Sequence, residues 1–144
     1  MSIHSNCFYC SKSERLGELM IEICQLGVST VYLFRDQSYR GRCIVQYRDH
    51  KTELFHLTDE ERDAFFSDVS TVASALYQTF SPDKLNYAIF GDNVPHLHIN
   101  VIPKFQNGPC WGKAFGSDPS VAKVFLTESE YQEMTAAIKA NMSR

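Results

Sequence analysis

One short segment, residues 96–101, restricts the fold of this chain more than any other. Its polar and apolar residues alternate strictly, which is the two-residue period of a β-strand. His96, His98 and Asn100 therefore share one face of the strand, and the opposite face is wholly apolar. We expect a strand with one face in the core and one face suited to chemistry.

Two prolines bracket this segment. Pro95 and Pro103 have no N–H to donate to a sheet, so we expect them at the two ends of the strand. The two imidazoles then lie about 6 to 7 Å apart along one face. A lone histidine is usually a core or edge residue, but two histidines and an amide on one polar face indicate a chemical site.

Length, charge and hydropathy narrow the classes of protein. The chain has 144 residues, 44% of them apolar, and a formal net charge of -3. This size and composition predict a single globular domain, residues 1–144. No basic run favours a nucleic-acid polymer as partner, although a small anionic ligand needs only a local positive pocket. No long apolar run and no signal peptide are visible, so we expect no membrane segment and a cytoplasmic location.

Two of the five cysteines form a Cys-x2-Cys pair, Cys7 and Cys10. An odd number of cysteines fits reduced thiols or metal ligands better than a set of disulfides. A thioredoxin-type redox pair would need a preceding strand, and only six residues precede Cys7. The pair is therefore either a chance spacing or half of a zinc site. The other zinc ligands would come from His4, His50, His56, His96 and His98.

Strand and helix signals follow along the chain. Residues 18–25, 29–34 and 42–47 predict three strands of an antiparallel meander, in which Cys24 and Cys43 are core residues. A capping box at Thr58 to Glu61 opens a long helix that ends before Ser81-Pro82. Residues 84–90 predict the strand that pairs with the histidine strand.

The last third of the chain has one irregular segment and one helix. Residues 105–126 are irregular and contain Trp111, for which packing and stacking on a base are both open interpretations. A second capping box, at Thr127 to Glu130, begins an amphipathic C-terminal helix. The order of elements predicts an α+β fold: an antiparallel sheet of about five strands, one long helix and a C-terminal helix.

The histidine strand resembles the active-site strand of the histidine triad (HIT) superfamily, His-φ-His-φ-His-φ-φ followed by proline. His-Leu-His-Ile-Asn-Val-Ile-Pro matches it with Asn100 in place of the third histidine. Residues 41–50 resemble a second stretch of the family, with Arg42 where many members have a histidine and His50 at the position of a zinc ligand. The resemblance covers residues 7–104 and implies a HIT-like fold, in most members a homodimer whose sheets join.

Site residues follow from this resemblance, position by position. It implies one structural zinc ion held by Cys7, Cys10, His50 and His96. It implies that His98 is the nucleophile, which requires a neutral imidazole whose other nitrogen is held as N–H by an acceptor. The resemblance also implies that Asn86 and Asn93 bind the substrate. Asn100 and Arg42 depart from the family pattern, but both side chains can donate hydrogen bonds to phosphate, so we expect them to bind substrate as well.

The activity implied is hydrolysis of nucleotidyl phosphoanhydrides or phosphoramidates, such as dinucleoside polyphosphates, through a nucleotidyl-histidine on His98. An asparagine cannot act as a general acid, so transfer of the nucleotidyl group to a phosphate acceptor is an alternative. A second alternative is a catalytically weak nucleotide-binding protein. A third is a metalloenzyme that uses His96 and His98 together as ligands, for which the five histidines of the chain are few.

Overall fold

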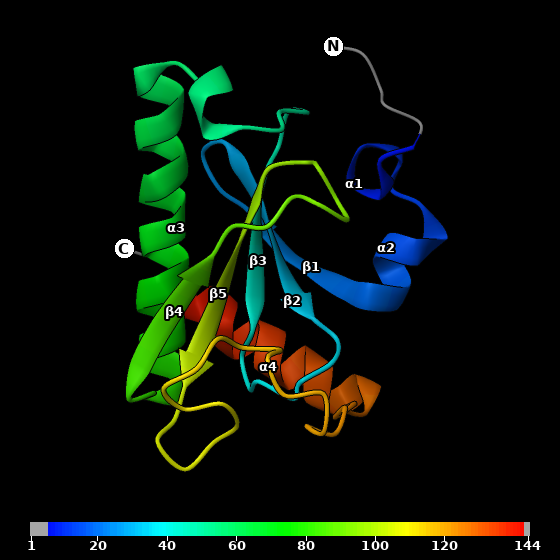
Figure 1. The fold of residues 1–144 in the computed structure, drawn as a ribbon, viewed down its shortest axis with the longest axis vertical. Coiled ribbons are helices and arrows are strands. Elements are labelled where there is room, and N and C mark those ends of the chain that lie inside the picture. The colour runs from blue at the N-terminus through cyan, green and yellow to red at the C-terminus, as the bar shows by residue number, and fades with distance from the viewer. Residues whose placement is uncertain (1–5, 143–144) are drawn as a thin grey trace.

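Five antiparallel strands form one sheet in the order β1-β2-β3-β5-β4, which confirms the predicted α+β architecture (Figure 1). The computed structural model describes residues 6–142, so His4 lies outside the described residues. The histidine strand β5 lies between β3 and β4. The strands are β1 (Met20–Gln25), β2 (Ser29–Phe34), β3 (Cys43–Tyr47), β4 (Lys84–Ala88) and β5 (His98–Lys104).

The two longest helices begin where the sequence signals lie. Both predicted capping boxes are present: the Thr58 hydroxyl accepts from the Glu61 N–H at 3.1 Å, and the Thr127 hydroxyl accepts from the Glu130 N–H at 3.2 Å. Each satisfies N–H groups that a helix start otherwise leaves without a partner. The helices are α1 (Phe8–Ser11), α2 (Glu14–Leu19), a 3-10 turn (Leu54–His56), α3 (Asp59–Phe80) and α4 (Glu128–Ala140).

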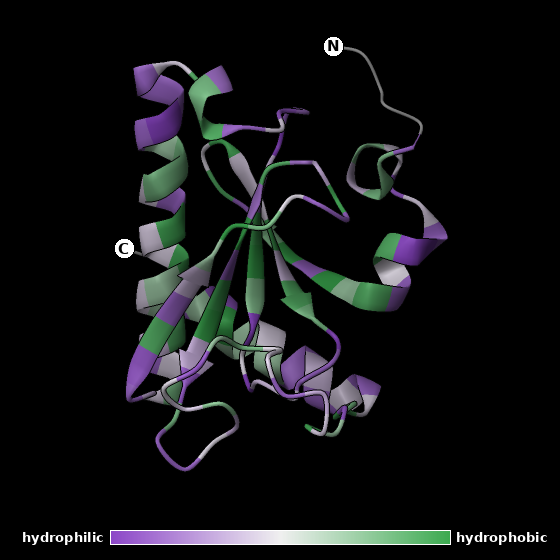
Figure 2. Cartoon of the chain, viewed as in Figure 1, coloured by the Kyte–Doolittle hydropathy of each residue, from purple (hydrophilic) through white to green (hydrophobic). Residues whose placement is uncertain are grey.

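One face of the sheet, which we call the core face, packs against α3 and α4. Val31, Val45 and Ile99 are cross-strand partners on this face and are fully buried. Phe65 of α3 and Ile138 of α4 are also fully buried and belong to the same cluster. Figure 2 shows the corresponding hydrophobic positions along the central strands. The predicted apolar stripes of both helices therefore form the core.

The opposite face, which we call the site face, has a smaller cover. Tyr32, Ile44 and Asn100 are cross-strand partners on it. Tyr9 and Leu16, from the N-terminal helices, pack there with Tyr32 and Ile44 in a second hydrophobic cluster. The helices α1 and α2 lie beside β1 (Figure 1), and Tyr9 of α1 also reaches the ring of His98, so the polar side chains of β5 on this face are buried.

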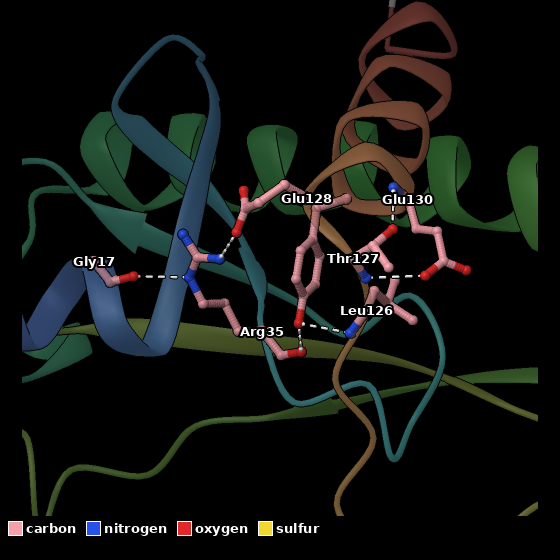
Figure 3. A network of polar contacts seen from close by, with 7 residues as sticks. Gly17, Arg35, Leu126, Thr127, Glu128 and Glu130 are labelled. Carbon is pink, nitrogen blue, oxygen red and sulfur yellow. Dashed lines mark hydrogen bonds and ion pairs between the residues drawn. The ribbon is translucent and has the colours of Figure 1, made fainter.

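Arg35 fixes the start of α4 to the N-terminal part of the chain (Figure 3). Its Nε donates to the Gly17 carbonyl at 2.8 Å, and its guanidinium pairs with Glu128 at 3.3 Å. The Tyr131 hydroxyl donates to the Arg35 carbonyl at 2.6 Å. These contacts hold the end of the irregular segment 105–126 in place.

The structure differs from the sequence predictions at several strand ends. β3 begins one residue later than predicted, and β4 ends two residues earlier. β1 begins at Met20 because residues 14–19 form helix α2, which the sequence analysis did not predict. β5 begins at His98, since the backbone before it bonds to Lys51. Pro103 lies one residue inside β5, so its placement at the strand end is wrong by one position. The pairing of β5 with β3 ends at Val101, two residues before Pro103. The missing N–H of Pro103 therefore removes no hydrogen bond between β5 and β3.

None of the helices within residues 6–142 combines the length and the hydropathy needed to cross a membrane.

Candidate metal centre and active site

Cys7, Cys10, His50 and His96 form one cluster at the edge of the site face. One donor atom from each lies within 4.8 Å of all the others. Cys7 Sγ is 3.3 Å from His96 Nδ1, and Cys10 Sγ is 3.2 Å from His50 Nδ1. In a tetrahedral zinc site with bonds of about 2.0 to 2.3 Å, ligand atoms lie roughly 3.3 to 3.8 Å apart. The spacing and the N/S donor set therefore fit a metal ion such as zinc.

Two local structures bring these four residues together. Cys7 precedes the single turn of α1 and Cys10 lies within it, so a three-residue spacing places both thiols on one side. The Leu97 N–H donates to the Lys51 carbonyl at 2.7 Å, which aligns the segment after β3 with the start of β5. His50 and His96 are thereby adjacent, with ring centroids 4.9 Å apart.

The hydrogen bonds of His96 prepare it as a ligand. Its Nε2 is 2.6 Å from the Tyr47 carbonyl, which can only accept, so Nε2 carries the proton. Nδ1 then carries the lone pair of the ring, and this atom lies 3.3 Å from Cys7 Sγ and 3.5 Å from Cys10 Sγ. The Gln46 amide nitrogen is also 2.7 Å from Nε2; half a turn of this amide, which exchanges its nitrogen and oxygen, satisfies both contacts.

His98 has the opposite tautomer to His96. Its Nδ1 is 2.6 Å from the His96 carbonyl, so Nδ1 is the donor and Nε2 carries the lone pair. Burial lowers the pKa of His98 below its ordinary value, and the charge of Arg42 lowers it further, against the opposite effect of the bond to the His96 carbonyl. The side chain is therefore a neutral imidazole at neutral pH, with one nitrogen available for attack.

Tyr9 joins the metal cluster to His98. It lies between the two cysteines in the sequence, and its buried ring is 5.3 Å from the His96 ring and 5.6 Å from the His98 ring, between centroids. Burial raises the pKa of its phenol, which stays neutral. Tyr9 was not among the predicted site residues, although its position inside the Cys-x2-Cys pair was an available signal.

Arg42 and Asn100 form a pair beside His98. Arg42 Nε donates to the Asn100 side-chain oxygen at 3.0 Å. The guanidinium lies 3.9 Å from the Phe34 ring centroid and 4.8 Å from that of Phe115. Burial lowers the pKa of Arg42 to about 10, so it keeps its charge at neutral pH. The residues that replace two family histidines thus make a joint set of donors, which suits an oxyanion.

The two other predicted substrate residues lie apart from this pair. Asn86 of β4 is the partner of Ile102 of β5, so it lies on the site face. It is farther from His98 along the sheet than Asn100 is. Asn93 is exposed in the loop before β5 and lines a cavity of about 580 Å³ with Arg15 and His50. His98 lies outside the metal cluster, and His56 is exposed on the 3-10 turn.

The fold and this site define a class: an α+β protein with a five-stranded antiparallel sheet, whose strand β5 carries a buried histidine beside a possible Cys and His metal site. The chain matches the family model of the HIT domain over residues 25–107 and therefore belongs to the HIT domain family.

Known relatives agree with this assignment. An uncharacterized HIT-like protein of Mycoplasma genitalium is 28% identical over 97 residues, which cover 64% of this chain and 66% of that relative. The protein Hit of Bacillus subtilis is 28% identical over 86 residues, 56% of this chain and 59% of the relative. A crystal structure of a histidine triad protein from Bradyrhizobium japonicum superposes with a TM-score of 0.81 at 25% identity, over 91% of this chain and 96% of that one.

Proposed function

We propose that this protein cleaves nucleotidyl phosphoanhydrides or phosphoramidates through a nucleotidyl-histidine on His98. The observation that carries the proposal is the hydrogen bond from His98 Nδ1 to the His96 carbonyl. It fixes the tautomer in which Nε2 is a nucleophile. The carbonyl oxygen also stabilises the positive charge that develops on the imidazole ring during attack. Membership of the HIT domain family supports nucleotides as the substrate class.

The proposed reaction has two displacements at one phosphorus atom. His98 Nε2 forms a bond to the α-phosphorus, and the bond from phosphorus to the leaving group breaks, with its electron pair leaving on that group. The Nδ1 proton stays on the ring, hydrogen-bonded to the His96 carbonyl. Water then attacks the same phosphorus and the bond to Nε2 breaks, which restores the neutral imidazole and releases the nucleoside monophosphate and a proton.

Arg42 and Asn100 are the proposed phosphate ligands. The guanidinium and the amide present N–H donors beside His98, and neither group can give a proton to a leaving group at neutral pH. A nucleotidyltransferase is therefore the second candidate: a phosphate acceptor takes the place of water in the second displacement. Binding of nucleotides with little turnover is the third.

Zinc is the proposed ion at Cys7, Cys10, His50 and His96. With four protein ligands the site is closed, as structural zinc sites are, so zinc would cross-link α1, the segment after β3 and the start of β5. The tautomer of His98 does not depend on this ion, because the His96 carbonyl accepts from Nδ1 and leaves the lone pair on Nε2. The odd number of cysteines, five, fits reduced thiols, which supports a reducing compartment, the cytoplasm, as the proposed location.

The nature of the leaving group tests this proposal. Because Asn100 cannot protonate a leaving group, adenylates with pyrophosphate or an acyl phosphate as leaving group should react at least about 100-fold faster than an adenosine phosphoramidate of an alkylamine. Asn100→His should narrow this ratio by about tenfold or more, since an imidazolium can protonate the amine. Steady-state kcat/KM for both substrates measures the ratio. Equal rates for both leaving groups in the wild-type protein would contradict the proposed role of Asn100.

We also propose a homodimer formed through β4 and α3. β4 is an edge strand, and exposed Phe66, Tyr87 and Ile89 line an apolar cavity between this strand and α3. A second copy that adds its own β4 would continue the sheet and cover these side chains. Light scattering at micromolar concentration should give a dimer for the wild type and a monomer for Tyr87→Lys. Phe125→Lys is the control, because it changes an exposed aromatic residue elsewhere and should remain a dimer. A wild-type protein that is a monomer would refute the proposal.

A further inference from the structure

A buried lysine holds the loop that follows β5. Lys104, the last residue of β5, is only 3% exposed, and its Nζ donates to the carbonyls of Cys110 and Lys113 at 2.7 and 2.8 Å. Backbone carbonyls in an irregular segment need such partners, so these two bonds give the loop a defined path. Residues 110–116 lie beyond residues 25–107, the part of the chain that matches the family model. The family model therefore does not include this loop.

Tyr39 provides a second attachment for the same loop. Its hydroxyl donates to Cys110 Sγ at 3.3 Å and accepts from the Gly116 N–H at 2.7 Å. Its buried ring also packs edge-on against Phe115, with the ring centroids 5.8 Å apart. The chain is thus held on both sides of Phe115, through the Lys113 carbonyl and the Gly116 N–H. These contacts fix the position of the Phe115 ring.

The Phe115 ring contacts the guanidinium of Arg42. The guanidinium carbon is 4.8 Å from the centroid of Phe115 and 3.9 Å from that of Phe34 in β2. Arg42 Nε also donates to the Asn100 side-chain oxygen at 3.0 Å. A guanidinium is planar, so two ring contacts and one hydrogen bond define its orientation.

The guanidinium has donors left for a ligand. It carries five N–H groups, and the bond to Asn100 uses one of them. Arg42 is partly exposed, and within residues 6–142 no carboxylate forms an ion pair with it. A phosphate group would supply the opposite charge, and a guanidinium binds phosphate best through two N–H groups that lie in one plane. Binding of phosphate therefore depends on the orientation of this plane.

We propose that Phe115 is a positioning residue for the reaction at His98: its ring holds the Arg42 guanidinium in the orientation that binds a phosphate oxygen of the substrate. The inference rests on the proposed function and adds the loop 110–116 to its site. An aromatic ring is needed at this position, because an aliphatic side chain fills space but offers no aromatic face to the cation.

Steady-state kinetics of two Phe115 substitutions tests this role. Phe115→Leu should lower kcat/KM for an adenylate that the wild type turns over by about tenfold, whereas Phe115→Tyr, which keeps the ring, should stay within about twofold of the wild type. In an Arg42→Lys background, Phe115→Leu should have little further effect, since an ammonium group has no plane to orient. Phe125→Leu changes an exposed aromatic residue of the same irregular segment; it is the matched control and should keep the kcat/KM of the wild type.

The affinity for AMP gives a second readout that needs no turnover. Isothermal titration calorimetry should show that Phe115→Leu binds AMP about tenfold more weakly than the wild type, with no such difference in the Arg42→Lys background. This result does not depend on whether His98 is the nucleophile, so it separates the inference from the proposed reaction. Thermal unfolding checks that each variant is folded, and Phe115→Met takes the place of Phe115→Leu if the leucine variant is not.

Three outcomes would overturn the positioning role and leave the His98 proposal standing. In the first, the effects of Phe115→Leu and Arg42→Lys simply multiply, because the two side chains then act independently. In the second, Phe115→Leu keeps the kcat/KM and the AMP affinity of the wild type. In the third, Phe115→Tyr is as impaired as Phe115→Leu, so that the ring is not the group that matters. A wild-type protein that neither binds AMP nor turns over an adenylate would overturn both proposals.

Discussion

Replacement of His98 by asparagine is expected to lower turnover by about 10⁴-fold or more, while the fold and the metal content are unchanged. An amide has no basic nitrogen with which to attack phosphorus. Its nitrogen can still donate to the His96 carbonyl, as His98 Nδ1 does at 2.6 Å, so the local structure is kept. The loss should therefore appear in kcat and not in stability.

Steady-state kinetics with an adenylate that the wild type turns over gives the first measurement. Rapid quench with the same adenylate, labelled at phosphorus, should trap an acid-labile, alkali-stable adduct on His98 in the wild type and none in the variant. His56→Asn is the matched control, because His56 is exposed on the 3-10 turn and far from the nucleophile in the sequence. A His98→Asn protein that keeps most of its activity would exclude the nucleophile assignment.

Loss of the metal is the second large effect that we expect. Cys10→Ser removes a sulfur atom that is 3.2 Å from His50 Nδ1 and 3.5 Å from His96 Nδ1, and a serine hydroxyl is a poor zinc ligand. Zinc content should fall from about one ion per chain to near zero. The free energy of unfolding should fall by roughly 3 to 5 kcal/mol, because binding of a structural ion contributes directly to folding.

Metal analysis of protein purified without chelator, followed by thermal and denaturant unfolding, provides the measurement. Cys110→Ser is the matched control, since this cysteine lies in the irregular segment outside the cluster. Chelation of the wild type should reproduce the loss of stability seen in Cys10→Ser. A wild-type protein that is fully stable without metal, or a Cys10→Ser variant that retains its zinc, would refute the structural role.

Much of the fold follows from local patterns in the sequence. Thr58 and Thr127 each begin a helix, because a capping box satisfies its N–H groups with side chains only three residues away. The alternation after Pro95 predicts which residues of β5 face the core, since the period of a strand leaves no other choice. The predicted start of β1 was two residues too early, because the sequence gives no comparable signal for the short helix α2 before it. This helix is stabilised by its packing on the sheet.

The candidate site could be predicted only in part. Cys7, Cys10, His50 and His96 are brought together as a possible metal site, as the resemblance to the HIT superfamily implied. A cavity of about 440 Å³ lined by Lys84, Lys104 and Lys113 was not predicted, since these lysines meet only through the register of β4 with β5 and the path of a loop. Likewise, the stacking of Phe34 and Phe115 on Arg42 depends on the fold of segments distant in the sequence.

The span of the metal cluster affects how the protein is made. Cys7 and His96 are separated by 89 positions, so all four donors exist only after the ribosome has synthesised the segment between them. Closing a loop of that length costs the unfolded chain roughly (3/2)RT ln n, about 4 kcal/mol, before any contact is gained. The two cysteines are synthesised before β5, so an ion bound by them alone would be held weakly until β5 has been synthesised and has folded beside them.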